Sequence, residues 1–250
     1  MSPRFGGRME ITMKVLLLAA GRGTRISRYL GGNPKCTVDI GGEKLIHYTI
    51  RMLHEKGIDD IAIVLGYKGS KIQDVLKDFP FVRYYTNPFY DVTNSIASAW
   101  FARDFLKDTD DTLIMNADVF LDSVLMDRII NVTESPVMFA DSSRKEEADY
   151  KFKFTNGILE AYGKELTGDD ISGEYVGIGR FSSSFMNDFI AELDRLIGTQ
   201  THNVWWENVV YSLSEKMPVK VIDISGMFWA EVDYIEDYNR ILDHVSEQKN

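Results

Sequence analysis

Apolar residues occur along the chain as short continuous runs that alternate with longer segments in which they are spaced as on one face of a helix. The run from Val15 to Ala19 is followed by glycines, which is typical of a central strand buried on both faces. From 44 to 56 the pattern predicts a helix that ends at Gly57. Further strands are expected at 61–65, 82–85 and 112–115, with helices at 70–76 and 94–106. This alternation predicts an α/β fold, doubly wound around a mainly parallel mixed sheet.

The pattern changes after a strand expected at 137–140. Short strands at 150–154, 158–162 and 175–181 predict a small antiparallel insertion at about 141–181. Helices at 183–197 and 204–214, strands at 219–224 and 228–230, and a closing helix at 234–245 complete the expected order. Apolar segments are spread evenly, so we expect one domain over 13–250, preceded by a flexible extension, 1–12, that is polar and rich in Gly and Pro.

Composition limits the classes of partner. A formal net charge of -10 argues against a surface that follows a nucleic-acid backbone, because such a surface needs clustered Lys and Arg. No apolar run approaches the roughly 18 to 20 residues that span a bilayer. The single cysteine, Cys36, allows neither an intrachain disulfide nor a thiolate metal cluster. We therefore expect a cytoplasmic protein that binds small molecules and neither nucleic acid nor membrane, while its oligomeric state stays open.

A candidate phosphate-binding loop directly follows the first strand. Glycines allow backbone N–H groups to approach phosphate oxygens, and nearby cations can neutralise a triphosphate and the charge that develops at its α-phosphorus. The residues of this loop are Leu18, Ala20, Gly21, Gly23, Thr24 and Arg25, with Pro34-Lys35 shortly after. Two glycines alone also suit an ordinary tight turn. A dinucleotide-binding motif is excluded because Ile26 stands where its third glycine is required, and no Gly-Lys-Ser/Thr run forms a P-loop.

The segment Leu-x-Ala-Gly-x-Gly-Thr-Arg followed by Pro-Lys resembles the signature of the sugar-nucleotidyltransferase-like superfamily. Within it, the chain is most similar to bacterial phosphocholine and phosphonate cytidylyltransferases. The supporting stretches are Asn87-Pro88-Phe89-Tyr90, Asn116-Ala117-Asp118, Trp206-Glu207-Asn208 and 231–238. The resemblance implies a Rossmann-like nucleotidyltransferase fold and transfer of CMP from CTP, or of another NTP's monophosphate, to a small phosphate- or phosphonate-bearing acceptor. It favours acceptors of the 2-aminoethylphosphonate or phosphocholine type; a sugar 1-phosphate or inositol phosphate is the alternative.

Two carboxylates are candidates for a Mg²⁺ site. Asp118 follows the strand at 112–115 and Asp233 follows the strand at 228–230, so both should reach the sheet edge that carries the phosphate loop. The resemblance implies that both ligate the metal, and that Lys35 and Arg25 act with them in catalysis. Asp233 would also serve as a helix N-cap. Glu231 stands two residues before Asp233 and is a weaker metal candidate.

The resemblance also implies residues for base and acceptor recognition. Asn94 and Ser95 open a helix near the nucleobase, although Asn94 would equally serve as its N-cap, and Gly66 and Tyr67 match a position beside the base. Lys164 would grip the acceptor phosphate, and Glu174 would line its pocket. Trp205, Trp206 and Glu207 would hold a cationic amine through aromatic faces and an acid, or the tryptophans would pack in the core.

Two other functions stay open. A metal-dependent glycosyltransferase would bind a nucleotide at the same sheet edge, but Asn116 stands where an Asp-x-Asp motif would place an acid. An inactive nucleotide-binding regulator is disfavoured by the presence of Lys35, Asp118 and Asp233 together.

Overall fold

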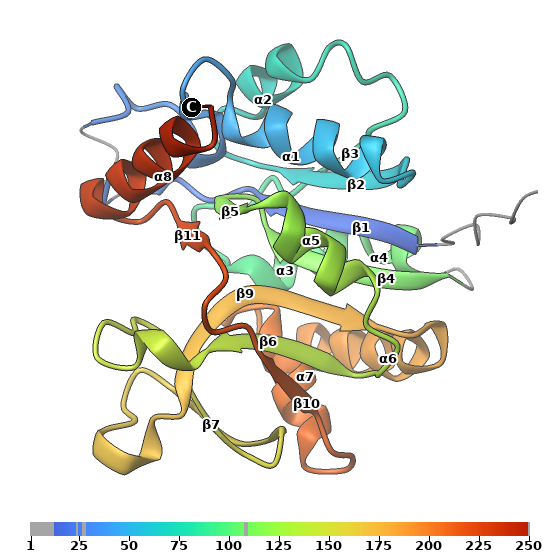
Figure 1. Ribbon diagram of the computed structural model, residues 1–250. Helices are drawn as coiled ribbons and strands as arrows, with labels where there is room; N and C mark the ends of the chain where they lie inside the picture. Colours follow the sequence, from blue (N-terminus) through green and yellow to red (C-terminus); the bar gives the residue numbers. More distant parts are fainter. Residues whose placement is uncertain (1–12, 24, 27–28, 108–109, 250) are drawn as a thin grey trace, which may run out of the picture.

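The structure is a computed structural model that describes residues 13–23, 25–26, 29–107 and 110–249, so the expected extension 1–12 and Thr24 lie outside the described residues. In this part of the chain nine strands form one sheet in the order β3-β2-β1-β4-β9-β6-β10-β8-β7 (Figure 1). Two further strands, β5 (Val119–Leu121) and β11 (Trp229–Glu231), form a separate antiparallel pair. The strands of the large sheet are β1 (Met13–Ala19), β2 (Asp60–Leu65), β3 (Arg83–Thr86), β4 (Asp111–Asn116), β6 (Val137–Asp141), β7 (Lys151–Thr155), β8 (Ile158–Gly163), β9 (Gly173–Phe181) and β10 (Lys220–Asp223).

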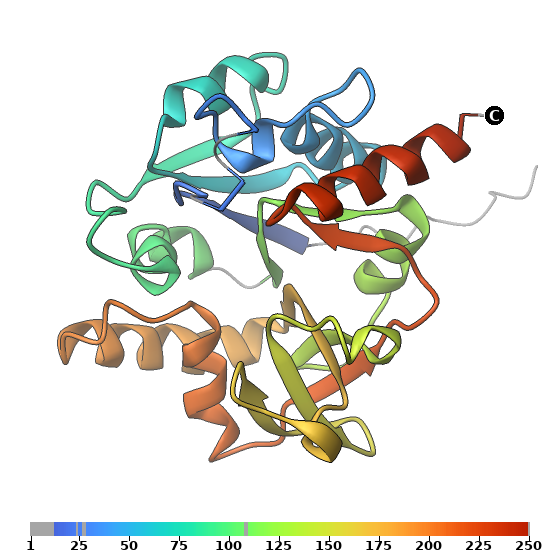
Figure 2. The ribbon, with the colours of Figure 1, turned by 90° about the vertical axis from the view of Figure 1, so that its left-hand side faces the viewer.

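Helices cover both faces of the sheet, as Figures 1 and 2 show. Successive side chains of β1 point to opposite faces, and each face has its own apolar core. Val15 and Leu17 pack with α1 (Leu45–Glu55), α2 (Gly69–Val75) and α5 (Ser123–Ile130). Leu16 and Leu18 pack with the helices of the other face, which are α3 (Ser95–Phe101), α4 (Arg103–Leu106), α6 (Ser183–Gly198) and α7 (Glu207–Ser214). Burial on both faces explains why β1 is apolar throughout.

The expectation of a mixed sheet is confirmed: β3, β2, β1 and β4 are parallel to one another, and β6 and β10 form a second parallel pair. The sheet is less parallel than expected, because the remaining pairings are antiparallel. β9 lies between β4 and β6 and is antiparallel to both. The hairpin β7–β8 continues the same sheet at its edge. β9, expected in a small insertion, is therefore an interior strand, and all nine of its residues are buried.

Some element boundaries differ from those expected. The helix expected at 94–106 is divided into α3 and α4 at Ala102. The helix expected from 204 begins only at Glu207, because the backbone before it is bound to α3: Ile96 N–H donates to the Val204 carbonyl, and Trp206 N–H donates to Ser95 Oγ at 2.9 Å. β5 and α5, which follow Asp118, were not anticipated from the pattern.

The last helix, α8 (Ile235–Glu247), packs beside the β5–β11 pair (Figure 1). Ile241 of α8 shares a buried cluster with Phe120 of β5, Ala230 of β11 and Leu45 of α1. This cluster fixes the C-terminal part of the chain against the N-terminal half of the fold. Among the described residues, none of the helices combines the length and apolar character that crossing a bilayer requires.

Candidate active site

A cavity of about 480 Å³ opens where β1 and β4 reach their carboxyl ends. Leu18, Gly21 and Gly23 line it from the side of β1, and Asn116 and Asp118 from the side of β4. A smaller cavity of about 180 Å³ shares Leu18, Gly21, Asn94 and Asn116 with it and adds Ala20, Ser95 and Ser98. Ligands of open α/β sheets bind at this edge, so the sheet places the cavity where a nucleotide site is expected.

Two glycines allow neighbouring segments to pack closely against the loop after β1. Gly23 has a φ of +61°, and a Cβ built there would lie 2.4 Å from Lys35 Cγ. The missing side chain thus leaves room for the stem of Lys35, which follows Pro34 at the start of a short 3-10 helix, Lys35–Thr37. A Cβ on Gly66 would lie 2.6 Å from the Ala20 carbonyl oxygen, so Gly66 permits β2 to approach the loop.

Lys35 lies among carboxylates. Its Nζ is 3.3 Å from Asp118 Oδ2 and forms an ion pair and hydrogen bond with Asp233 Oδ1. Burial alone would lower the pKa of Lys35, but the charges of Asp118 and Asp233 raise it above its ordinary value. The ammonium group is therefore charged at neutral pH and is available to a phosphate.

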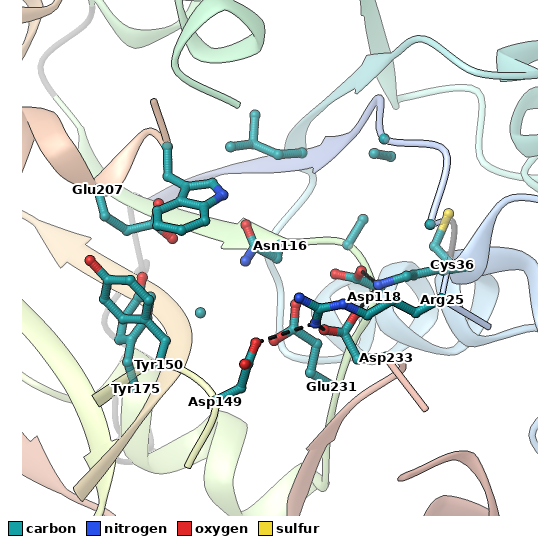
Figure 3. A pocket seen from close by; sticks show the side chains of 18 of the residues that line it. Arg25, Cys36, Asn116, Asp118, Asp149, Tyr150, Tyr175, Glu207, Glu231 and Asp233 are labelled. Atoms are coloured by element: carbon teal, nitrogen blue, oxygen red, sulfur yellow. Dashed lines mark hydrogen bonds and ion pairs between the residues drawn. The ribbon is translucent and has the colours of Figure 1, made fainter. Parts of the chain in front are cut away.

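The β5–β11 pair brings the acids together. Glu231 of β11 stands opposite Val119 of β5, next in sequence to Asp118, and Val232 N–H donates to the Asp118 carbonyl at 2.9 Å. Carboxylate oxygens of Asp118, Glu231 and Asp233 then lie within 4.8 Å of one another (Figure 3). Glu231, the weaker candidate in the sequence, is thus a full member of the cluster.

Confinement of these acids disfavours their charged forms. Burial and the neighbouring Asp118 and Asp233 raise the pKa of Glu231 well above its usual value. Burial also raises the pKa of Asp118, although Lys35 partly opposes this. Three convergent carboxylates are the oxygen donors that a hard divalent cation prefers, so the residues present fit Mg²⁺.

Asp149 links Arg25, the cation of the loop after β1, to Lys164. Arg25 Nη1 donates to Asp233 Oδ2 at 2.7 Å and to Asp149 Oδ2 at 3.3 Å. Lys164 Nζ donates to the same Asp149 oxygen at 2.8 Å. Burial tends to raise the pKa of Asp149, but these two cations outweigh it and lower the pKa. Asp149 belongs to no motif in the sequence, and only its position between Arg25 and Lys164 in the fold identifies it.

The residues expected around the base take two different positions. Asn94 is the N-cap of α3, with Oδ1 accepting from Ser95 N–H at 2.8 Å, and it also lines both cavities. Gly66 and Tyr67 are absent from the described lining of either cavity and instead support the loop. Tyr67 N–H donates to the Ala20 carbonyl at 3.0 Å.

The expected pair of tryptophans is divided between cavity and core. Trp205 lines the cavity and is 41% exposed. Trp206 is fully buried in the core, and its Nε1–H donates to Asn116 Oδ1 at 3.3 Å. The expected contact of Trp206 with the acceptor is therefore wrong, and the alternative, packing in the core, holds for this residue. A difference of one position before α7 turns its ring away from the cavity.

The two acids expected at the acceptor end also differ. Glu174 lines the cavity, but Arg144 Nε donates to its Oε2 at 2.7 Å and Asp149 N–H donates to its Oε1 at 3.1 Å. Glu174 thus holds Asp149 in place. Glu207, the first residue of α7, is buried, and burial raises its pKa to about 8 while Tyr175 partly opposes the rise. Figure 3 shows Glu207, Tyr150 and Tyr175 at one end of the pocket and Arg25, Asp118 and Asp233 at the other.

Glu207→Gln is expected to make the protein less sensitive to alkaline pH. Because the folded pKa is about 8 against 4.5 for the ordinary group, the folded state holds an extra proton between these values, and stability falls as pH rises through this window. Glutamine does not titrate, so Tm of the variant relative to wild type should rise by several degrees between about pH 5 and 9.

Scanning fluorimetry across this pH range measures the difference. Glu215→Gln, at an exposed position just after α7, is the matched control and should follow the wild type. Parallel curves for Glu207→Gln and wild type would show that the Glu207 carboxyl is not held neutral by the fold.

Comparison with known proteins extends this picture over nearly the whole chain. The model of the MobA-like NTP transferase domain matches residues 15–205. A CTP:phosphoglutamine cytidylyltransferase from Campylobacter jejuni is 29% identical over 90% of this chain and 97% of that protein. A choline-phosphate cytidylyltransferase from Streptococcus pneumoniae is 26% identical over 95% of this chain and 100% of that protein.

A solved structure of CTP:phosphocholine cytidylyltransferase from Streptococcus pneumoniae has the same fold. It superposes with a TM-score of 0.71 at 25% identity, covering 94% of this chain and 100% of the other. The family match includes the loop after β1, Lys35, Asp118 and Lys164. The resemblance inferred from the sequence is confirmed: the chain belongs to the MobA-like NTP transferase domain family and is a nucleotidyltransferase.

Proposed function

We propose that this protein transfers CMP from CTP to a small phosphorylated or phosphonylated acceptor of the 2-aminoethylphosphonate or phosphocholine type and releases pyrophosphate. One observation carries the proposal: Asp149 connects Arg25, on the phosphate loop, to Lys164, which directly follows β8 and lines the same cavity. Arg25 and Lys164 would each bind one phosphate group, and their shared contact with Asp149 would bring the phosphate groups of donor and acceptor together. The cytidylyltransferases that resemble the chain support CTP as the donor and a small phosphorylated compound as the acceptor.

The reaction needs alignment and charge neutralisation more than covalent participation by the protein. An ionised oxygen of the acceptor forms a bond to the α-phosphorus of CTP, and the bond from that phosphorus to the α–β bridging oxygen breaks. Pyrophosphate leaves with the electron pair. Lys35 and Arg25 stabilise the negative charge on the α-phosphate as this happens. The acceptor is already ionised, so no general base is required.

Asp118, Glu231 and Asp233 would hold Mg²⁺. When bound, the ion would neutralise negative charge on the phosphate groups. The ion would also compensate the mutual repulsion that raises the pKa of Glu231. Lys35 and Arg25, which contact Asp233 in this structure, would then be free to contact phosphate oxygens.

The nucleotide would occupy the part of the site next to the loop. Leu18, Ala20, Gly21 and Gly23 would contact it from β1 and the loop, and Thr24 completes the proposed set by its place in the motif. Asn94 and Ser95 would border the base, because they line the smaller cavity beside Leu18 and Gly21. The acceptor would lie at the opposite end, with its phosphate at Lys164 and its remaining atoms toward Trp205 and Glu207.

Pyrophosphate release from each of the four NTPs, with and without acceptor, tests this function. CTP with at least one of the two acceptors, 2-aminoethylphosphonate and phosphocholine, should give rapid release that requires both acceptor and Mg²⁺. Inositol 1-phosphate and glucose 1-phosphate serve as comparison acceptors. A clear preference for one of these, or for another NTP, would overturn the stated acceptor or donor, and release independent of any acceptor would overturn transfer itself.

A further inference from the structure

The end of the cavity remote from the phosphate loop contains buried oxygen atoms that lack partners. Glu207 and Tyr175 both line the cavity, and each residue is only 6% exposed. Glu207 Oε2 and the Tyr175 hydroxyl have no hydrogen-bond partner among the described residues. Burial raises the pKa of Glu207 and the nearby Tyr175 hydroxyl lowers it, so the two groups lie close together. Buried polar atoms are rarely left unpaired in the functional state of a protein, so these atoms indicate a ligand.

The hydroxyl of Tyr211 is a third buried oxygen near Glu207. Tyr211 stands one helical turn after Glu207 on α7, and its buried hydroxyl also lacks a partner in the described part of the chain. Its ring is stacked with that of Tyr150, at 6.3 Å between centroids and 8° between planes. Burial raises the pKa of Tyr211, and the nearby Glu207, Tyr175 and Tyr150 raise it further, so these polar groups lie close together.

Aromatic rings form the remaining wall. Tyr150 lies edge-on to Trp205, with centroids 5.3 Å apart and planes at 85°, and edge-on to Tyr175 at 6.1 Å. The faces of such rings attract a cation. Lys164 Nζ lies 5.9 Å from the centroid of Trp205, so this wall adjoins the proposed phosphate position.

Rings alone would accept either a primary ammonium or a trimethylammonium group. The unpaired oxygens distinguish the two, because a primary ammonium carries three N–H donors and a trimethylammonium group carries none. Burying a methyl group against Glu207 Oε2 and the Tyr175 hydroxyl would leave both unpaired in the complex, at a cost in affinity.

Resting on the proposed function, we propose that this enzyme selects acceptors that end in a primary ammonium group, bound by Glu207 and Tyr175, over their trimethylammonium analogues. The acceptor is then an aminoalkyl phosphate or phosphonate, and phosphocholine is a poor substrate. Glu207 and Tyr175 determine this specificity, while Trp205 and Tyr150 favour a cation without discriminating between the two groups.

Matched acceptor pairs test the selection directly. Phosphoethanolamine and phosphocholine differ only by three N-methyl groups, as do 2-aminoethylphosphonate and its trimethylammonium analogue. In the wild type, kcat/KM should favour the primary ammonium in each pair by about 100-fold or more, because sites built to bind a substrate N–H group discriminate strongly against analogues that lack it.

Two substitutions locate the origin of the preference. Glu207→Gln should reduce it to about tenfold or less by lowering kcat/KM for the amine far more than for the quaternary acceptor, and Tyr175→Phe should reduce it partially. Glu215→Gln, on the exposed surface after α7, is the control and should keep the wild-type preference. Circular dichroism confirms that each variant folds.

The outcomes separate this inference from the function on which it rests. If both phosphoethanolamine and phosphocholine are turned over and kcat/KM for phosphocholine is equal or higher, the amine selection is overturned and cytidylyl transfer stays in place. Equal losses for both acceptors in Glu207→Gln and Tyr175→Phe would do the same. No turnover with any phosphate or phosphonate acceptor would overturn the proposed function and the selection together.

Discussion

Lys35→Ala should lower kcat on the order of 10²–10³-fold, the effect of removing one preorganised group that stabilises charge in a transition state. Lys35 lies between Asp118 and Asp233 and keeps its proton because their charges outweigh its burial. Its contribution should be largest as charge develops at the α-phosphorus, so KM for CTP should change less than kcat.

The same substitution should have a second, measurable consequence. Without the ammonium group, the repulsion between Asp118 and Asp233 is compensated only through the contact of Arg25 with Asp233, so the thermal stability of the variant should depend more on Mg²⁺ than that of the wild type. Lys44→Ala is the matched control, since Lys44 is exposed and pairs with Asp39 at 3.6 Å away from the cavity. Near-normal turnover of a folded Lys35→Ala variant would remove Lys35 from the mechanism.

Asp118→Asn, Asp233→Asn and Glu231→Gln should each weaken Mg²⁺ binding and lower the activity. Each substitution keeps the shape of the side chain but removes one charged oxygen donor from the cluster. Loss of an outer partner of a metal ligand already costs about 10–100-fold in affinity or activity, so loss of a ligand should cost at least as much. Activity titrated against Mg²⁺ should show half-saturation at higher concentration and a lower plateau.

Glu231→Gln is the most informative of the three, because sequence reasoning ranks this residue below the aspartates. Asp243→Asn, at an exposed position on α8, controls for the loss of one negative charge. Wild-type metal dependence in Glu231→Gln would restrict the site to Asp118 and Asp233, and full wild-type activity in excess chelator would contradict a metal site altogether.

Local features of the sequence predicted the parts of the site that follow directly from a strand. β1 is apolar on both faces and is followed by glycines, so the phosphate loop was predictable, as were Asp118 after β4 and Asp233 after β11. Lys35 was identified through its motif, and the space it occupies beside Gly23 depends on an absent side chain.

Features that depend on pairing between distant segments were not predictable. Glu231 joins the cluster only because β11 pairs with β5, a contact between residues more than 100 positions apart in the chain. Asp149 gains its role from Arg25, Lys164 and Glu174, which come from three separate segments. β9 has the same apolar pattern in any orientation, so the pattern alone did not reveal that it enters the sheet antiparallel between β4 and β6.

The tryptophans show the same limit at the scale of one residue. Trp205 and Trp206 are the same residue type at neighbouring positions, so the sequence does not distinguish them. The hydrogen bond from Trp206 N–H to Ser95 Oγ fixes the start of α7, which places the ring of Trp206 in the core and that of Trp205 at the cavity. Periodicity locates a helix with less accuracy than this distinction requires.

Phosphorus-31 NMR of a reaction containing CTP, Mg²⁺ and 2-aminoethylphosphonate tests the central claim most directly. The account predicts two new, mutually coupled resonances from a phosphonate bonded through oxygen to the α-phosphorus of CTP, together with an equal amount of pyrophosphate. Formation of CDP with a phosphorylated acceptor, or of CMP with unchanged acceptor, would contradict it.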